Sequence, residues 1–189
     1  MMTSHKKIDK DVPEGAVIFL GDSLVQGLAV EAVAPYSINY GIDGDTTDGL
    51  VDRLPYYASL QRAGLIVIAI GINDLSRRSD AEILGNYQKI IEALPANKPV
   101  LLSLIYPVDE ISSERSGYNA RIKKINSALS VYCTRQLRLY CLDISDEVIA
   151  ADGGQVDRFH AADGLHLSPA GARLWINHLR SFFHTVINT

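Results

Sequence analysis

The run Leu65-Ile66-Val67-Ile68-Ala69-Ile70 decides the fold class of this chain. It is too short for a helix, and it is rich in β-branched residues, which favour strands. Successive side chains of a strand point to opposite faces, so an unbroken apolar run must be buried on both of them. Such strands are typical of parallel sheets that are covered by helices on each side. The run therefore predicts an α/β domain.

Shorter apolar runs alternate with segments of helical character on both sides of this strand. The further strands that we predict cover residues 16–20, 37–40, 100–105 and 139–142. Capping signals and apolar periodicity predict helices over residues 24–33, 47–62 with a break near Pro55, 79–94, 114–137 and 168–187. This alternation predicts a three-layer, flavodoxin-like α/β fold with about five parallel strands and helices on both faces.

Composition excludes several classes of protein. The chain has 189 residues, with 18 Lys and Arg against 22 Asp and Glu, which gives a formal net charge of −4. This balance argues against a nucleic-acid partner, which requires a basic surface. The longest apolar stretch, residues 65–72, is far shorter than the roughly 20 residues of a transmembrane helix. The basic N-terminus is not followed by an apolar segment, so we expect a cytoplasmic protein by default, or a periplasmic or secreted one if a leader was removed.

The domain organisation is expected to be simple. Residues 1–11 are predicted to form a flexible tail and residues 12–189 a single domain, because no repeat or linker interrupts the alternation. Cys133 and Cys141 are too few for a disulfide scaffold. A single bridge between them stays open, but two buried free thiols in a reducing compartment are the stronger expectation.

Polar, glycine-bearing segments follow the predicted strands. They are Gly21-Asp22-Ser23, residues 41–47, Gly71-Ile72-Asn73-Asp74 and Tyr106-Pro107. Ligands of open α/β sheets bind beyond the carboxyl ends of the strands, so these segments are expected at one edge. A further polar turn, Asp163-Gly164-Leu165-His166, directly precedes the last predicted helix. The sequence therefore predicts a site where these loops meet.

Ser23, Asp163 and His166 are the candidates for nucleophilic chemistry. Ser23 follows a buried strand and opens a helix, whose N-terminus favours developing negative charge. A serine there is by itself more often an N-cap, and its hydroxyl needs a neighbouring base to become a nucleophile. A turn would bring the Asp163 carboxylate to one ring nitrogen of His166 and leave the other to accept a proton. By itself this pair is equally compatible with a turn residue and a surface histidine.

Acyl transfer also needs hydrogen-bond donors for an oxyanion, and the loops offer three. They are the backbone N–H groups of Ser23 and Gly44 and the side-chain amide of Asn73. A glycine lets its N–H approach a ligand closely. Each of these residues taken singly is more simply a turn residue.

The order of these motifs is more informative than any one of them. Gly21-Asp22-Ser23-Leu24, Gly71-Ile72-Asn73-Asp74 and Asp163-Gly164-Leu165-His166 follow one another along the chain. With this combination, the sequence resembles the GDSL/SGNH hydrolase family over roughly residues 16–187. It is most similar to the small single-domain bacterial esterases and lipases, including the thioesterase and lysophospholipase type.

The resemblance implies a fold and a set of roles. The family fold is a five-stranded parallel sheet between helices. Ser23 would be the nucleophile, His166 the base and Asp163 the residue that orients it. The oxyanion hole would comprise the Ser23 and Gly44 N–H groups and the Asn73 side chain. Gly41 could also be the glycine of the family's motif after the second strand, but Gly44 is preferred because Gly-Asp-Thr-Thr resembles the family's usual continuation.

The function we expect is a cofactor-independent serine esterase or lipase that acts on a small carboxylic ester or thioester. Leu24, Tyr106 and Pro107 are the candidates for its acyl pocket. We expect no metal, since His160 lacks further ligands at a suitable spacing. The alternatives are a carbohydrate O-acetylesterase, an acyltransferase that uses the same acyl-enzyme, and a catalytically silent binding module on a flavodoxin-like fold.

Overall fold

Five parallel strands form one sheet in the computed structural model of the chain, which describes residues 2–149 and 157–186. The strands are β1 (Val17–Gly21), β2 (Ser37–Gly41), β3 (Leu65–Ala69), β4 (Val100–Ser103) and β5 (Leu139–Leu142). Their order is β2-β1-β3-β4-β5, which confirms the predicted parallel α/β fold. From β1 the chain adds β2 on one side, and it then adds β3, β4 and β5 on the other side. The boundary between β1 and β3 is therefore a topological switch point, where open α/β sheets bind ligands. The loops that carry Ser23 and Asn73 begin there.

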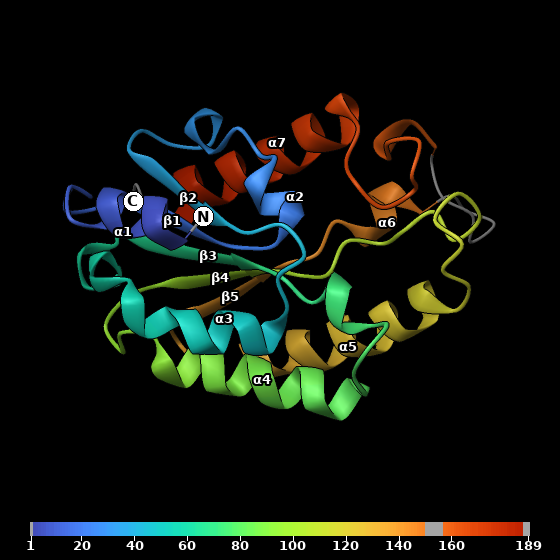
Figure 1. Cartoon of the computed structure of the whole chain (residues 1–189), viewed down its shortest axis with the longest axis horizontal. Helices are drawn as coiled ribbons and strands as arrows, with labels where there is room; N and C mark the ends of the chain where they lie inside the picture. Colours follow the sequence, from blue (N-terminus) through green and yellow to red (C-terminus); the bar gives the residue numbers. More distant parts are fainter. Residues whose placement is uncertain (1, 150–156, 187–189) are drawn as a thin grey trace.

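Helices cover both faces of the sheet (Figure 1). On one face lie α3 (Thr47–Arg53), α4 (Asp80–Ala93) and α5 (Tyr118–Cys133). On the other face lie α2 (Ser23–Gln26), α6 (Ser145–Val148) and α7 (Pro169–Val186). Short 3₁₀ helices occupy Val30–Ala32, Leu54–Tyr56, Ala58–Arg62, Ile72–Asp74 and Asp157–Phe159. None of the helices in the described part of the chain is long and apolar enough to span a membrane.

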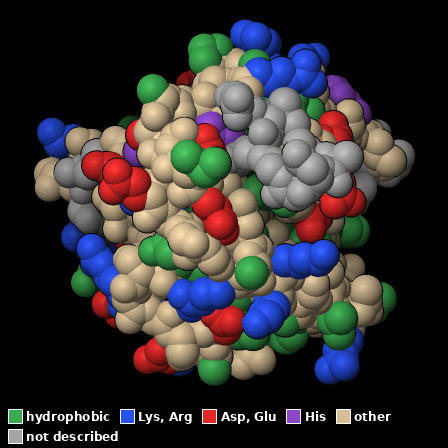
Figure 2. Space-filling model, turned by 90° about the vertical axis from the view of Figure 1, so that its right-hand side faces the viewer, with side chains coloured by type: hydrophobic (Ala, Val, Ile, Leu, Met, Phe, Trp, Pro, Cys, Tyr) green, Lys and Arg blue, Asp and Glu red, His purple; other side chains and the backbone are tan. Residues whose placement is uncertain are grey.

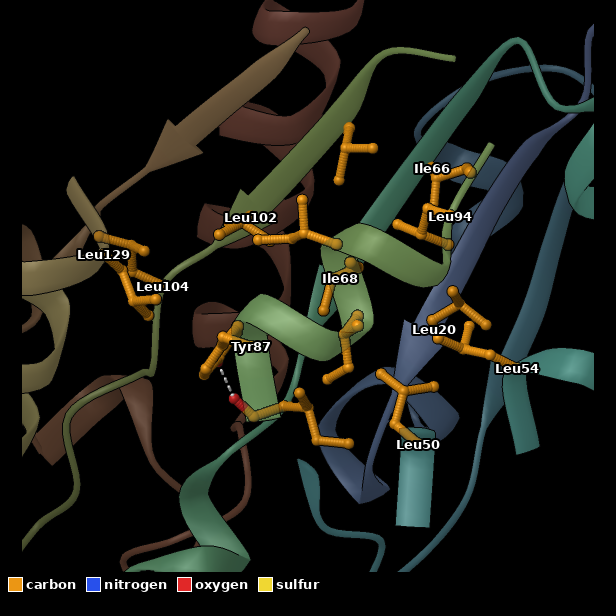
Figure 3. Close-up of a cluster of buried hydrophobic side chains, with 14 of the residues drawn as sticks. Leu20, Leu50, Leu54, Ile66, Ile68, Tyr87, Leu94, Leu102, Leu104 and Leu129 are labelled. Carbon is orange, nitrogen blue, oxygen red and sulfur yellow. Dashed lines mark hydrogen bonds between the residues drawn. The ribbon is translucent and has the colours of Figure 1, made fainter. Parts of the chain in front are cut away.

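The sheet divides the hydrophobic core into two clusters, because successive strand side chains alternate between its faces. Figure 3 shows the cluster beneath α3 and α4, where Leu20, Ile68 and Leu102 pack against Leu50 and Tyr87. The opposite cluster is formed largely by residues of β1, β3, α2 and α7. Every residue of β3 is buried, as the apolar run at residues 65–70 predicts.

Two predicted helices are shorter than their sequence patterns suggested. The helix expected over residues 24–33 ends at Gln26, because the Asn39 side-chain amide donates to the carbonyl oxygens of Val25 (2.7 Å) and Leu28 (3.2 Å). The helix expected over residues 114–137 begins only at Tyr118, since Gly117 before it has a left-handed φ of 81°. The predicted closing helix reaches Val186 among the described residues, and Ile187 lies outside them.

The N-terminal segment is a docked helix, so the expectation of a flexible tail over residues 1–11 is wrong. Met2–Asp9 form α1, and Met1 lies outside the described residues. The buried Asp9 carboxylate accepts hydrogen bonds from the Ser59 hydroxyl (2.5 Å), the Ser59 N–H (3.2 Å) and the Tyr40 hydroxyl (3.1 Å). These partners are distant in sequence, so a local polar pattern gave no sign of the docking.

The two cysteines form a disulfide, so the expectation of two free thiols is also wrong. Cys133 is the last residue of α5 and Cys141 lies in β5, with their Cα atoms 6.1 Å apart. The chain turns back between the helix and the strand, which brings residues only eight positions apart face to face. The bridge therefore ties the end of α5 to the edge strand of the sheet.

The docking of α1 leads to a prediction about stability. Replacing Asp9 by Ala leaves the buried Ser59 and Tyr40 donors without their acceptor, so the free energy of unfolding should fall by about 2 kcal/mol or more. Urea unfolding measures this loss. The matched control is Asp11→Ala, which removes an exposed carboxylate just beyond the same helix. Equal stability of the two variants would contradict the docked helix.

Candidate active site

Ser23 is the first residue of α2, at the carboxyl end of β1. The N-cap of this helix is Asp22, whose side chain accepts the Leu24 N–H at 3.0 Å. The capping role considered for Ser23 is therefore taken by its neighbour. The Ser23 hydroxyl oxygen instead lies 3.0 Å from Nε2 of His166, 143 positions later in the chain.

The turn that carries His166 holds the ring in one orientation. Nδ1 of His166 lies 2.5 Å from Oδ2 of Asp163. The other oxygen of this carboxylate accepts the backbone N–H groups of Leu165 (3.0 Å) and His166 (2.9 Å). A carboxylate can only accept, so Nδ1 carries the ring proton and Nε2 of a neutral ring faces the serine as an acceptor. The hydrogen bond from His166 lowers the pKa of Asp163 to about 2, so this carboxylate is charged at neutral pH.

Backbone contacts fix this turn to the rest of the molecule. The Asp109 N–H donates to the carbonyl oxygen of Gly164 at 2.8 Å, and the Ala161 N–H donates to that of His166 at 2.8 Å. His160 lies beneath the turn, and its Nε2 donates to the carbonyl oxygen of Pro107 at 2.8 Å. Residues 2–149 and 157–186 contain no group of three or more His, Cys, Asp or Glu side chains that could hold a metal ion.

The loops after β2 and β3 are joined to each other. The side-chain amide of Asn73 donates to the carbonyl oxygen of Asp45 at 2.9 Å. Asp74, which is completely buried, accepts the N–H (2.9 Å) and the hydroxyl (2.6 Å) of Thr47. Each loop therefore limits the movement of the other. Gly44 lies directly before Asp45, in the left-handed region with a φ of 71°, which a glycine adopts without strain.

Gly41 and Gly44, the two candidates for the family's glycine after the second strand, have different surroundings in the structure. Gly41 is the last residue of β2, and a Cβ atom there would lie 2.2 Å from the backbone nitrogen of Gln26. Its role is to let α2 pack closely on the strand. Gly44 is exposed in the loop, with nothing within 4 Å of the position that a Cβ would take. Of the two, Gly44 is the one whose surroundings leave room for a ligand.

A small cavity of about 20 Å³ lies next to the start of α2. Both neighbours of Ser23 line it, as do Ile72, Tyr106 and Trp175. Leu24 and Tyr106, two of the three candidates for an acyl pocket, thus line the same cavity. Pro107 lies elsewhere: it borders a second cavity of about 540 Å³ between α5 and the segment that follows β5.

The turn that carries Asp163 and His166 reaches the molecular surface. The side chains of His166 and Asp163 are 44% and 52% exposed, so a substrate can approach them from solvent. Figure 2 shows the end of the molecule at which the loops after the strands gather. Acidic and basic side chains are interspersed among the coloured atoms of this face. The coloured part of this face therefore does not carry charge of a single sign.

The comparisons with known proteins agree with this geometry. The model of the GDSL-like Lipase/Acylhydrolase family matches residues 19–174. The chain belongs to this family. It is therefore a serine ester hydrolase, and the interpretation as a silent binding module loses its support.

Three similar proteins show what this chain resembles in sequence or in fold. Platelet-activating factor acetylhydrolase IB subunit alpha2 of Rattus norvegicus is 25% identical over 180 residues, which cover 90% of this chain and 77% of that protein. A GDSL-like lipase from Bacteroides thetaiotaomicron shares the fold with a TM-score of 0.84, at 16% identity and 97% coverage of both chains. The C-terminal catalytic domain of peptidoglycan O-acetyltransferase A from Streptococcus pneumoniae shares it with a TM-score of 0.70, at 15% identity, over 94% of this chain and 96% of that one.

Two residues that support the site of this acylhydrolase were missed in the sequence. Asn39 ends α2, and Arg53 is buried at the end of α3 with its side chain beside the loops. Arg53 had a detectable signal, because it shares a helical face with Leu50 and Leu54, which are apolar and buried. Asn39 had none, since its partners lie more than ten positions away.

Asp22 is an unusual carboxyl group in this acylhydrolase. Complete burial raises its pKa to about 7, and the nearby Asp45 and Asp74 carboxylates also raise it. In the unfolded chain its pKa returns to about 3.9. Between these two values the folded chain holds a proton that the unfolded chain has lost, so rising pH destabilises the fold.

This difference in pKa predicts the pH dependence of stability. The variant Asp22→Asn keeps an N-capping oxygen but cannot ionise. The free energy of unfolding of the wild type, minus that of the variant, should decrease from about pH 4 to about pH 7 and then level off. Urea unfolding of both proteins across this range measures the difference. If this difference in unfolding free energy stays constant or rises with pH, the raised pKa of Asp22 is contradicted.

Proposed function

We propose that this chain hydrolyses a small carboxylic ester or thioester through an acyl-enzyme on Ser23, with His166 as base and Asp163 as its orienting partner. One observation carries the proposal. A single line of contacts runs from the Ser23 hydroxyl through His166 to the Asp163 carboxylate, with distances of 3.0 and 2.5 Å. This arrangement removes a proton from the serine as the hydroxyl attacks a carbonyl carbon.

The reaction proceeds in two halves. His166 Nε2 takes the Ser23 proton while the serine oxygen bonds to the carbonyl carbon, and the carbonyl oxygen becomes negative. When this intermediate collapses, the alcohol or thiol leaves with the proton from His166 and an ester remains on Ser23. A water molecule then attacks this ester and gives a proton to His166, and His166 passes this proton to the serine oxygen as the acid is released.

Three donors would stabilise the negative oxygen. They are the N–H groups of Ser23 and Gly44 and the side-chain amide of Asn73. This amide has two N–H groups, and one of them is already held by the Asp45 carbonyl oxygen. The other therefore has a fixed direction before substrate arrives, which is the preorganisation that makes such donors effective.

The acyl group that this site favours is short. A cavity of about 20 Å³ accommodates only one small group, since a single water molecule needs about 10–15 Å³ on this measure. This size fits the methyl group of an acetyl ester. The name of the relative from Rattus norvegicus, an acetylhydrolase, supports the same choice. Hydrolysis of an O-acetylated carbohydrate and acyl transfer to an alcohol would both pass through the same acyl-enzyme. Experiment distinguishes these two alternatives from hydrolysis of a simple ester.

The role of Ser23 predicts the effect of its removal. The Ser23→Ala variant should lose at least about 10⁴-fold in kcat for a nitrophenyl acetate, because no acyl-enzyme can form. Circular dichroism should show an unchanged fold. The control is Ser127→Ala, which removes an exposed serine hydroxyl of α5 and should keep full activity. Turnover by Ser23→Ala close to that of the control would refute the proposal.

The size of the cavity predicts the chain-length preference. Across nitrophenyl esters from acetyl to octanoyl, kcat/KM should be highest for acetyl and should drop at least about tenfold by butanoyl, because longer chains do not fit. Rates that rise toward octanoyl would exclude this cavity as the acyl site. Product analysis with added alcohol or sugar acceptors separates hydrolysis from transfer, and the proposal expects free acid as the main product.

A further inference from the structure

Arg53 is a buried cation at the end of α3, and it makes four hydrogen bonds. Its Nε donates to the Asp45 carboxylate at 2.7 Å. One terminal nitrogen, Nη1, donates to the Tyr40 carbonyl oxygen (2.9 Å) and to the Tyr57 hydroxyl (2.8 Å). The other, Nη2, donates to the Gly21 carbonyl oxygen at 2.9 Å. Only 6% of the side chain is exposed, so the guanidinium group lies inside the molecule, where water does not compete for these contacts.

These partners lie next to the three donors proposed for the oxyanion. Gly21 ends β1 two positions before Ser23. Asp45 directly follows Gly44, and its carbonyl oxygen holds the amide of Asn73 at 2.9 Å. A single planar group is thus bonded to the strand end that leads to Ser23 and to the residue that links Gly44 with Asn73.

We propose that Arg53 is a positioning residue that sets the relative placement of the oxyanion donors. This inference rests on the proposed function, and it concerns the geometry of the same site. A guanidinium group is a rigid fork with five N–H donors, so it fixes the directions as well as the distances of its partners. The ammonium group of a lysine has a single nitrogen and cannot reach the carboxylate and both carbonyl oxygens in the same way.

A role in positioning differs measurably from a role in stability alone. The donors act on the oxygen only after it becomes negative, so displacing them raises the barrier without weakening substrate binding. Displacing the groups that act on the reacting atoms by about 1 Å can lower the rate about a hundredfold. The loss should therefore appear in kcat, with KM nearly unchanged, and in the affinity for an alkylboronic acid, whose serine adduct places an oxygen where the oxyanion forms.

The main test replaces Arg53 by Lys. We expect kcat for nitrophenyl acetate to fall about 10- to 100-fold, KM to stay within about twofold, and the inhibition constant of the boronic acid to rise by the same factor as kcat falls. The matched control is Arg62→Lys. Arg62 also donates from its guanidinium group to backbone carbonyl oxygens, those of Val12 (2.9 Å) and Asp9 (2.7 Å), but it does not contact the loops of the site. This control should lower the melting temperature without changing kcat.

A second variant covers the case in which Arg53→Lys does not fold. Asp45→Asn keeps the backbone carbonyl that binds Asn73 but removes the charged partner of Arg53. We expect this variant to lower kcat and to weaken boronic acid inhibition by a common factor of about ten. If its kcat and inhibition constant equal those of the wild type, the inference is overturned. Equal losses of kcat in the Arg53 and Arg62 variants would also overturn it. Ser23→Ala is assayed in parallel: if it stays active, the proposed function fails, whereas its inactivity beside a fully active Arg53→Lys refutes the positioning role alone.

Discussion

The hydrogen bond between the Ser23 hydroxyl and Nε2 of His166 joins residues that are 143 positions apart, and the proposed chemistry depends on it. Its length of 3.0 Å requires that the carboxyl end of β1 and the turn before α7 meet. The parallel sheet makes this possible, because it places the ends of all its strands at one edge. Asp22 caps α2 and so leaves the Ser23 hydroxyl available. Asp163 binds Nδ1 of His166, on the side of the ring away from the serine.

Buried polar contacts hold the other loops in place around this bond. Asp74 binds both the N–H and the hydroxyl of Thr47, and Asn73 binds the Asp45 carbonyl oxygen. A buried polar group that loses its partner costs free energy, so these contacts allow the loops few alternative arrangements. The fold therefore holds the proposed oxyanion donors in place before a substrate arrives, and preorganised donors of this kind can supply much of an enzyme's rate.

Local patterns were sufficient for the sheet, whereas Ser23, Asp163 and His166 became the candidate triad through the order of their motifs and the family resemblance that this order carries. The run at residues 65–70 predicted a doubly covered strand, and all of β3 is buried. By contrast, α1 is short and polar, and its Asp9 finds partners 31 and 50 positions away. Arg53 likewise reaches Gly21, 32 positions earlier. Contacts of this range leave no local periodicity. Cys133 and Cys141 are only eight positions apart, but a count of two cysteines did not by itself establish a bridge.

The identity of the reactive serine is the most direct test of the whole account. A fluorophosphonate forms a stable adduct only with a serine that is activated by a base, and peptide mass spectrometry locates this adduct in the intact chain. The account predicts one adduct, on Ser23, that forms in step with the loss of esterase activity. An adduct on another serine that abolishes activity, such as one on Ser59 beside the Asp9 carboxylate, would contradict it.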